Sequence, residues 1–526
     1  MSSIIVCISN NLKHDMRVLR QVGTFAEAFD KVIVCARPIP DRTEHYQADN
    51  VEWVWFENDV VPDEKRIRRL AKKYGVYEEL ISIAPVILDD NVLGKSENIE
   101  FERRIQEIQM SHRRWDEVGK GIPAEATDDE QVYWLLFNID LILQWADLVT
   151  GIDADIIYCN DYDTLLCGVA HKKVKGSRLI YDEHDLYCDS FPYLFPAIYR
   201  SFIALFEYEF LKHADAMISV SEAAVGWLKE TYDLTYTPLF VPNCKDVHED
   251  LPAGDTGIDY PIRLYFQGFA DAGKGLGEVI EAIKHTDEAV LHLRCLENEY
   301  VAELKEYVSE NDLGGKVRFF DPVSPHDVIA AARTDGDIGL TISVGETSIG
   351  IRNTITNKLI EYLTAGLPVI VSEEMRDQSR IVGEYDAGFV VGKDIRKELP
   401  RILDDIRKDP GLISTMSGNA KKAANEIFRW ENYKDRFIEL VCGGNEGSKP
   451  AEAQQSIPYD DLLADMEILR KQICLIMENR NEIVIEKKKL EIELQELKAS
   501  NSWRIGRAFT RPARMIKKQK SGYVDD

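Results

Sequence analysis

Short apolar runs alternate with amphipathic stretches along most of the chain, and this pattern predicts parallel sheets covered by helices. Near the N-terminus, strands are predicted at residues 4–8 and 31–35, with a helix between them over residues 16–29. An unbroken apolar run is typical of a strand that is buried on both faces of a parallel sheet. Strand, helix and strand at this spacing form a βαβ unit, so the first domain is expected to be doubly wound.

The same pattern returns later in the first domain and again beyond residue 260. The further strands are predicted at residues 156–159, 179–181, 216–220, 263–267, 290–295, 317–320, 338–342, 368–371 and 389–391. Because each of the early strands ends in a polar cluster, the chemistry is expected at the carboxyl ends of the strands. Two consecutive doubly wound domains would face each other across a cleft.

The domain boundaries follow from changes in composition and periodicity. We expect an N-terminal domain at residues 1–243 with a helical elaboration at about 60–148, a linker at 244–260, a second domain at 261–440, a flexible linker at 441–458, a coiled coil at 459–498 and a basic tail at 499–526. The coiled coil is predicted because apolar residues recur in alternating steps of four and three for about five heptads. It makes a homo-oligomer the expected state, although a single helix lying on the body of the protein is an open alternative.

The tail has a composition unlike that of the rest of the chain. Residues 499–522 contain no acidic residue, and their arginines and lysines are interleaved with aromatic and aliphatic side chains. Such a segment suits an anionic membrane surface. A solvated tail, or a strip that docks on the acidic body, would explain the same composition.

Charge and cysteine content limit the class of protein. The 526 residues carry a net charge of −27, which argues against nucleic acid as a partner. No apolar run approaches the roughly 20 residues of a membrane span, and the N-terminus lacks the basic region of a signal peptide. The nine cysteines include no C-x-x-C pair, as expected in a reducing compartment. We therefore expect a cytoplasmic protein, with the tail as a peripheral contact at the inner face of the membrane.

The run NKLIEYLTAGLPVI, residues 357–370, carries the clearest chemical signal. Lys358 and Glu361 lie three residues apart at the start of a predicted helix. The N-terminus of a helix offers unpaired N–H groups and a partial positive charge, which suit a phosphate. A carboxylate one turn further along can accept hydrogen bonds from the two hydroxyls of a ribose. An ordinary amphipathic helix before a strand would have the same pattern.

Seven segments in order resemble glycosyltransferase family 4, a retaining class with the GT-B fold of two Rossmann-like domains. They are DMRVLRQVGTFAEAFDKVIVCARP, LIYDEHDLY, HADAMISVSEAA, VPN, YFQGFADAGKGLGEVIEAI, NKLIEYLTAGLPVI and FRWENY. The tail segment NSWRIGRAFTRPAR also resembles C-terminal tails of bacterial transferases that build cell-surface polysaccharides. The resemblance implies transfer of a sugar from a nucleotide-diphosphate sugar to a glycan or a lipid-linked acceptor.

The resemblance also implies roles for residues of the second domain. Lys274 and Lys358 would stabilise the diphosphate leaving group as negative charge develops on it. The remaining donor-binding residues would be Gly268, Gly275, Arg352, Asn357 and Glu361. Binding of the diphosphate by lysines makes a metal or other cofactor unnecessary. The D-x-D pairs, such as Asp161 with Asp163, are ordinary loop chemistry on this interpretation.

In the first domain, His184 matches the family position where a histidine at a strand end contacts the donor sugar. A neutral imidazole would suit a hydrogen bond to a sugar hydroxyl, and the flanking Glu183 and Asp185 could orient the ring. Asp15 and Arg17 resemble a first-loop pair of the family and, with Asp185, would shape the acceptor side. The alternatives are a structural histidine and a helix N-cap at Asp15.

Two positions depart from the family pattern. Phe269 stands where an arginine usually follows the glycine, and Asn353 stands where a first glutamate is common. Loss of one of two diphosphate cations costs on the order of a few kcal/mol of transition-state stabilisation, unless Arg352 or Lys358 replaces it. A noncatalytic nucleotide-sugar-binding scaffold and a nucleotide-sugar epimerase of the same fold therefore stay open. A dehydrogenase is disfavoured because no G-x-G-x-x-G follows the first strand.

Overall fold

The structure is a computed structural model, and it describes the greater part of the chain between residues 2 and 443. The described residues are 2–10, 15–37, 47–56, 63–83, 128–188, 197–232, 234–245, 260–345 and 348–443. All of them belong to residues 1–466, one of the two units into which the chain divides. The predicted coiled coil, the basic tail and residues 84–127 of the predicted helical elaboration lie outside the described residues, so the predictions attached to them stay predictions.

The first sheet is parallel throughout and is ordered β3-β2-β1-β4-β5-β6-β7. Its strands are β1 (Ser3–Cys7), β2 (Lys31–Ala36), β3 (Val51–Trp55), β4 (Ile156–Asn160), β5 (Arg178–Glu183), β6 (Ala216–Ser219) and β7 (Leu239–Phe240). The central strands are buried along nearly their whole length, as their apolar runs predict.

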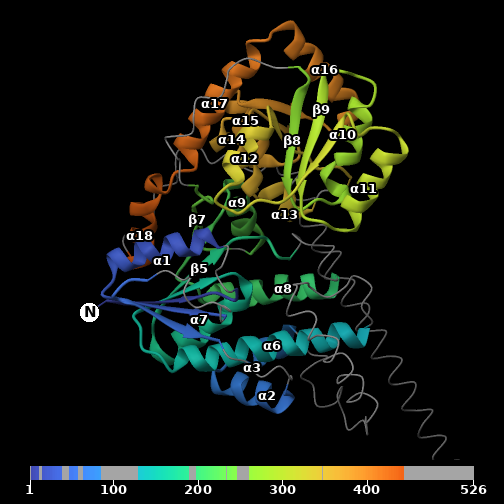
Figure 1. The fold of residues 1–526 in the computed structure, drawn as a ribbon. Coiled ribbons are helices and arrows are strands. Elements are labelled where there is room, and N and C mark those ends of the chain that lie inside the picture. Colours follow the sequence, from blue (N-terminus) through green and yellow to red (C-terminus); the bar gives the residue numbers. More distant parts are fainter. Residues whose placement is uncertain are drawn as a thin grey trace, which may run out of the picture. The chain divides into compact units, whose positions relative to one another are not determined.

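Helices cover both faces of this sheet (Figure 1). They are α1 (Met16–Ala28), α2 (Glu64–Lys73), α3 (Tyr77–Ile83), α6 (Asp128–Thr150), α7 (Tyr162–Lys175), α8 (Ala197–Phe210) and α9 (Glu222–Thr231), with a 3-10 turn, η2, at Leu211–His213. Close packing fixes where small residues are needed. A side chain at Gly168 of α7 would place its Cβ 2.2 Å from Leu179 Cδ1 of β5, so glycine lets this helix approach the sheet.

The second sheet is also parallel and is ordered β10-β9-β8-β11-β12-β13. Its strands are β8 (Ile262–Gly268), β9 (Ala289–Cys295), β10 (Val317–Phe320), β11 (Ile338–Thr341), β12 (Val369–Ser372) and β13 (Gly388–Val391). The strand order reverses between β8 and β11, and ligands of open α/β sheets bind at such a switch point, beyond the carboxyl ends of the strands.

Two apolar cores lie on the two faces of the second sheet. The first is formed mainly with α10 (Leu276–Ile283), α11 (Glu299–Glu310) and α16 (Ile395–Lys408), and the second with α12 (Val328–Asp335), α14 (Asn357–Ala365), α15 (Arg376–Glu384) and α17 (Leu412–Ile427). The short elements are η3 (Ala272–Lys274), α13 (Ile349–Asn353) and η4 (Trp430–Asn432). This two-faced covering is visible in Figure 1.

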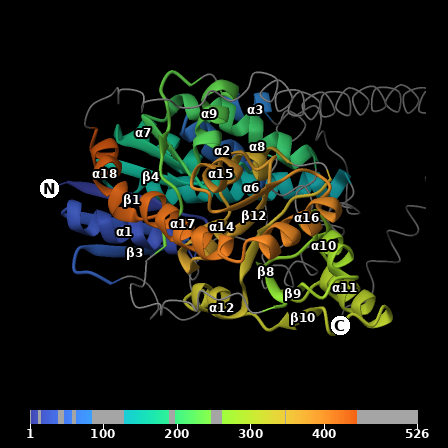
Figure 2. The ribbon, with the colours of Figure 1, turned by 90° about the horizontal axis from the view of Figure 1, so that it is seen from above.

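The last described helix, α18 (Lys434–Cys442), packs in the first domain although it follows the second in sequence. It lies beside α1 in both views (Figures 1 and 2). The Phe437 ring stacks on Phe25 with ring centres 5.3 Å apart, and Trp430 Nε1 donates a hydrogen bond to Thr24 Oγ1 at 3.0 Å. The chain therefore returns to the first domain after completing the second.

The two doubly wound domains confirm the predicted fold class, and the predicted strands differ from the observed ones by one or two residues at their ends. Two strands were not predicted. β3 is only partly buried at the edge of the sheet, and its sequence VEWVW lacks an unbroken apolar run; β7 has two residues. Among the described helices, none is long and apolar enough to cross a membrane.

Candidate functional site

A glycine-rich turn connects β8 to α10 at the carboxyl edge of the second sheet. Gly268 ends β8 with φ +98°, and Gly275 precedes α10 with φ +64°, both in the region that favours glycine. A Cβ at Gly275 would stand 2.9 Å from Ile342 Cγ2 and 3.0 Å from Val344 Cγ1. Glycine at 275 therefore allows both the backbone turn and its contact with the segment after β11.

Lys358, in the first turn of α14, lies against Gly268. A Cβ at Gly268 would stand 3.4 Å from Lys358 Cε and 3.7 Å from its Nζ, and this Nζ lies 5.1 Å from the centre of the Phe266 ring. The space beside Gly268, one of the predicted donor-binding residues, therefore holds the Lys358 ammonium group. Lys274 approaches from the turn itself, 3.8 Å from Asp271 Oδ2.

The two ammonium groups repel each other. Burial and the charge of Lys274 lower the pKa of Lys358 to about 8, although Glu361 and Asp271 act in the opposite direction. A pair of close cations at a helix N-terminus is stabilised by an anion, and a diphosphate carries enough charge for both. The predicted Lys274 and Lys358 are therefore brought together.

Glu361 lies one turn further along α14 and is 8% exposed. Its Oε2 accepts a hydrogen bond from Gln267 Nε2 at 2.7 Å, and its Oε1 is 2.8 Å from Lys245 Nζ. Both oxygens thus have donors, and a carboxylate oxygen can accept more than one hydrogen bond. Neither Gln267 nor Lys245 was predicted, because each is distant from Glu361 in sequence.

The other predicted donor-side residues lie around the start of α14. Asn357 is exposed as its first residue, and its Oδ1 accepts from Asn243 Nδ2 of the first domain at 3.3 Å. Arg352 lies on α13, and its charge lowers the pKa of Lys393 against the larger effect of Glu374, which raises it. Asn353, in the position of the common glutamate, is fully buried and its Nδ2 donates to Ile349 O at 2.8 Å.

His184 follows β5 in the first domain and lies between two carboxylates. Its Nε2 is 3.2 Å from Asp182 Oδ2, and its Nδ1 is 3.6 Å from Asp161 Oδ2. Burial lowers the pKa of His184, but these two carboxylates prevail and raise it to about 9. The ring is therefore an imidazolium at neutral pH, and our expectation of a neutral imidazole was wrong.

Arg17 is buried against Asp182 in a two-pronged ion pair. Arg17 Nη2 lies 2.8 Å from Asp182 Oδ1, and Nε donates to Oδ2 at 3.2 Å. Gln21 and Tyr158 also donate to this carboxylate, each at 2.7 Å. The pKa of Asp182 falls well below its usual range because Arg17 and His184 outweigh the effect of burial. Arg17 thus acts on the site through Asp182.

The two remaining acceptor-side candidates differ in their surroundings. Asp15 caps α1, since its Oδ1 accepts from Val18 N at 3.1 Å, which is the alternative role that the sequence left open. Asp185 lies beside His184, and burial raises its pKa to about 6 against the effect of that imidazolium. Their roles towards an acceptor stay predictions.

The D-x-D pair after β4 belongs to the same acidic group. Burial raises the pKa of Asp161 to about 7 and that of Asp163 to about 6. Asp161 has φ +64° at the start of α7, and its Oδ1 accepts from His184 N at 3.1 Å. Within the described ranges, no group of histidine, cysteine, aspartate and glutamate could hold a metal ion. Through its contacts with the backbone N–H and with Nδ1, Asp161 orients His184.

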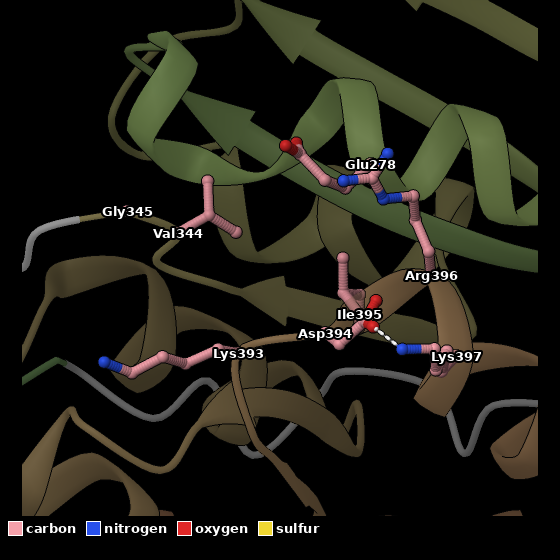
Figure 3. A pocket seen from close by; sticks show the side chains of 8 residues that line it. All are labelled: Glu278, Val344, Gly345, Lys393, Asp394, Ile395, Arg396 and Lys397. Carbon is pink, nitrogen blue, oxygen red and sulfur yellow. Dashed lines mark ion pairs between the residues drawn. The ribbon is translucent and has the colours of Figure 1, made fainter.

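A pocket of about 530 Å³ lies between the start of α10, the segment after β11 and the start of α16 (Figure 3). Its lining comes from Glu278 of α10, from Val344 and Gly345 after β11, and from the residues 393–397 at the start of α16. Lys397 Nζ is 2.6 Å from Asp394 Oδ2, as drawn in Figure 3. Because Val344 borders both the pocket and Gly275, the pocket adjoins the predicted diphosphate site.

Comparisons with known proteins concern the family and the fold. Residues 111–244, about a quarter of the chain, match the family model described as "Glycosyltransferase Family 4". No curated protein matches the chain in a sequence search.

Solved structures show the fold. Sucrose-phosphate synthase from Thermosynechococcus elongatus is similar with a TM-score of 0.56 at 14% identity, over 84% of this chain and 99% of that one. HepE from Anabaena, solved with UDP, has a TM-score of 0.52 at 14% identity, over 84% and 100%. A variant of TarM from S. aureus, solved with fondaparinux, α-GlcNAc-glycerol and UDP, has 0.52 at 10%, over 84% and 100%. The chain has the GT-B fold.

Proposed function

We propose that the protein is a glycosyltransferase that moves a sugar from a nucleotide-diphosphate sugar to an acceptor hydroxyl. The observation that carries this proposal is that Lys358 lies beside Gly268 and close enough to Lys274 for the two charges to repel, with Glu361 one turn further along the same helix. The cations match a diphosphate, and the carboxylate matches a ribose diol at the spacing of one helical turn. The matched family model and the UDP held by HepE support the same assignment.

The charge of His184 supports a retaining route in which the leaving group itself takes the proton. An imidazolium cannot accept a proton from the acceptor, so His184 serves as a hydrogen-bond donor to the transferred sugar. The acceptor oxygen would bond to the anomeric carbon as the bond from that carbon to the phosphate oxygen breaks. The acceptor proton passes to the released phosphate, which Lys274 and Lys358 stabilise.

The acceptor is proposed to be a glycan or a lipid-linked glycan of a cell-surface polysaccharide. The resemblance of the basic tail to tails of bacterial transferases supports this class, together with the location that it implies, cytoplasmic and peripheral at the inner face of the membrane. Lysine side chains balance the diphosphate charge in this proposal, so no metal is required.

A ligand panel followed by a transfer assay tests the proposal. The melting temperature of the full chain is measured with UDP, GDP and ADP and with their sugars, next to Glu361→Ala. A ligand at about 100 times its dissociation constant adds about 2.7 kcal/mol to stability. A base-selective shift that Glu361→Ala abolishes is expected, followed by release of that nucleoside diphosphate only when an acceptor is present. No shift with any nucleotide rejects the proposal.

A noncatalytic nucleotide-sugar-binding scaffold is the second candidate, because Phe269 replaces the usual arginine and is 42% exposed. The two candidates differ in turnover. A scaffold binds the nucleotide sugar but releases no nucleoside diphosphate with any acceptor, and Phe269→Arg would restore release if the missing arginine is the cause. An enzyme in which Lys358 replaces the arginine turns over without this substitution.

A further inference from the structure

A directional chain of hydrogen bonds leads through the second domain to the carboxylate of Glu361. It begins with Arg294, whose Nη2 is 2.6 Å from Asp335 Oδ2 and whose Nε donates to Tyr265 Oη at 3.1 Å. Tyr265 Oη is in turn 3.1 Å from Gln267 Oε1, and Gln267 Nε2 is 2.7 Å from Glu361 Oε2. Three elements, β8, β9 and α14, therefore contribute to one chain.

Chemistry determines the direction of every step. A guanidinium has donors and no acceptor, so Tyr265 Oη accepts a hydrogen bond from Arg294. The hydroxyl proton of Tyr265 is then donated to Gln267 Oε1. An amide whose oxygen is held in this way turns its NH2 group towards Glu361. The orientation of the Gln267 amide thus follows from the arginine at the other end of the chain.

Gln267 is also fixed through its backbone. Its N–H donates to Tyr362 Oη at 3.0 Å, and Tyr362 is the neighbour of Glu361 on α14. Tyr265 and Tyr362 are completely buried, and Gln267 is 4% exposed. Because these side chains have no room to turn, the amide presents its proton to Glu361 at a fixed point.

We propose that Gln267, oriented by Tyr265, is the positioning residue that makes Glu361 selective for a ribose over a 2′-deoxyribose. The inference rests on the proposed function, in which Glu361 holds the nucleotide. A ribose diol needs two acceptor oxygens in one plane and at one angle. A carboxylate on a glutamate side chain can rotate. The Gln267 donor fixed on Oε2 of Glu361 prevents this rotation and leaves the remaining lone pairs of the carboxylate for the two ribose hydroxyls. Without this donor, the carboxylate would be held only by Lys245, whose Nζ lies 2.8 Å from Oε1.

Dissociation constants of ribonucleotides and their 2′-deoxy forms test the proposal. UDP, GDP and ADP, each with its 2′-deoxy counterpart, are titrated by calorimetry into the full chain, Gln267→Met, Tyr265→Phe and Tyr307→Phe. Methionine keeps the length of the side chain and removes the amide. Tyr307→Phe is the matched control, since Tyr307 binds Glu281 and Lys284 at the surface of the same domain.

The expected result is a change of selectivity. The wild-type protein should bind its ribonucleotide about 10-fold or more tightly than the 2′-deoxy form, as one well-placed hydrogen bond at a buried carboxylate predicts. Gln267→Met should lower this ratio at least about threefold by weakening the ribonucleotide alone. Tyr265→Phe should lower it in the same direction and by less, and Tyr307→Phe should leave it unchanged.

The outcomes separate this inference from the function on which it rests. If Gln267→Met weakens both forms equally, its role is structural and the inference is wrong. If Glu361→Ala removes the selectivity while Gln267→Met retains it, the nucleotide site stands and the inference fails alone. If the wild-type protein binds no nucleotide, both fail. Tyr265→Phe, which removes one oxygen from the same chain, carries the test should Gln267→Met not fold.

Discussion

The ammonium group of Lys245 lies 2.8 Å from Oε1 of Glu361, the carboxylate proposed to bind the ribose. Lys245 belongs to residues 241–245, which are held to α1 as well, since Arg17 Nη1 donates to Val241 O at 2.7 Å and Arg20 Nη1 to Cys244 O at 2.9 Å. The segment thus contacts α1, on the proposed acceptor side, through Val241 and Cys244, and Glu361, on the proposed donor side, through Lys245. A nucleotide that binds Glu361 competes with the contact between Lys245 and Glu361.

Lys245→Met should therefore tighten nucleotide binding. The ion pair is partly buried, and loss of a competing contact of about 1 kcal/mol lowers the dissociation constant about 3- to 10-fold. Calorimetric titration of the nucleoside diphosphate that stabilises the wild type measures the change. Lys229→Met, which removes a surface contact with Thr237, is the control and should have no effect. Weaker binding in Lys245→Met would mean that Lys245 stays beside the bound ribose.

The sequence predicts those parts of the fold and site that are local. Lys358 and Glu361 share a helix three residues apart, and the turn at Gly366 ends it in the left-handed conformation, so pattern and turn chemistry suffice there. The contacts that complete the site join distant residues: Gln267 and Glu361 are 94 positions apart, and Arg17 and Asp182 are 165 apart. A single sequence contains no signal for such distant pairs.

The charge of His184 shows how a local interpretation can fail. From the sequence, its neighbours Glu183 and Asp185 could either orient it or face solvent, but alternate residues of a strand point to opposite faces. Asp182, two positions back, and Asp161, directly after the neighbouring strand β4, therefore hold the ring. Glu183 points away and contacts Tyr181, with Glu207 in the same buried group. The alternation of a strand predicts to which face of the sheet each side chain points. The residues that contact it there can be named only when the neighbouring strand is known.

Lys358→Met should reduce turnover about 100-fold or more, because it removes a cation from the developing diphosphate charge. The same substitution should increase the stability of the folded protein at neutral pH. The folded pKa of about 8 lies below the usual 10.5, so between these values the unfolded chain binds more protons and the wild type gains stability as pH rises. The variant lacks that gain and should be about 1 to 2 kcal/mol more stable than the wild type at pH 7.

Urea unfolding at pH 7 and pH 10, together with single-turnover rates, measures both effects of Lys358→Met. The matched control is Lys305→Met, which removes a surface ion pair with Glu297 in the same domain and should change neither quantity. Equal pH dependence of stability in Lys358→Met and in the wild type would show that the lysine is not held in the repulsive pair described.

Arg17→Ala should destabilise the first domain by about 3 to 5 kcal/mol. Removal of one partner of a buried ion pair leaves the other charge without compensation, and Asp182 is completely buried. The midpoint of urea unfolding measures the loss. Arg20→Ala, on the same face of α1 but half-buried, is expected to cost about 1 kcal/mol or less. Similar losses in the two variants would show that Asp182 finds sufficient compensation in His184, Gln21 and Tyr158.

The protonated state of His184 predicts a specific dependence of stability on pH. The folded pKa of about 9 lies above the usual 6.5, so the folded state binds more protons between these values. The contribution of His184 is complete below pH 6.5 and is lost as pH rises to 9, by up to about 3 kcal/mol. His184→Gln should lack this loss, so the difference in unfolding free energy between wild type and variant should shrink across that window.

Lys358 makes the protein more stable as pH rises above 8, but it does so equally in the wild type and in His184→Gln. The difference between the two proteins therefore excludes the effect of Lys358. A constant difference from pH 6 to 9.5, or a ring that titrates near 6.5 by NMR, would show that the imidazole is neutral and available as a base.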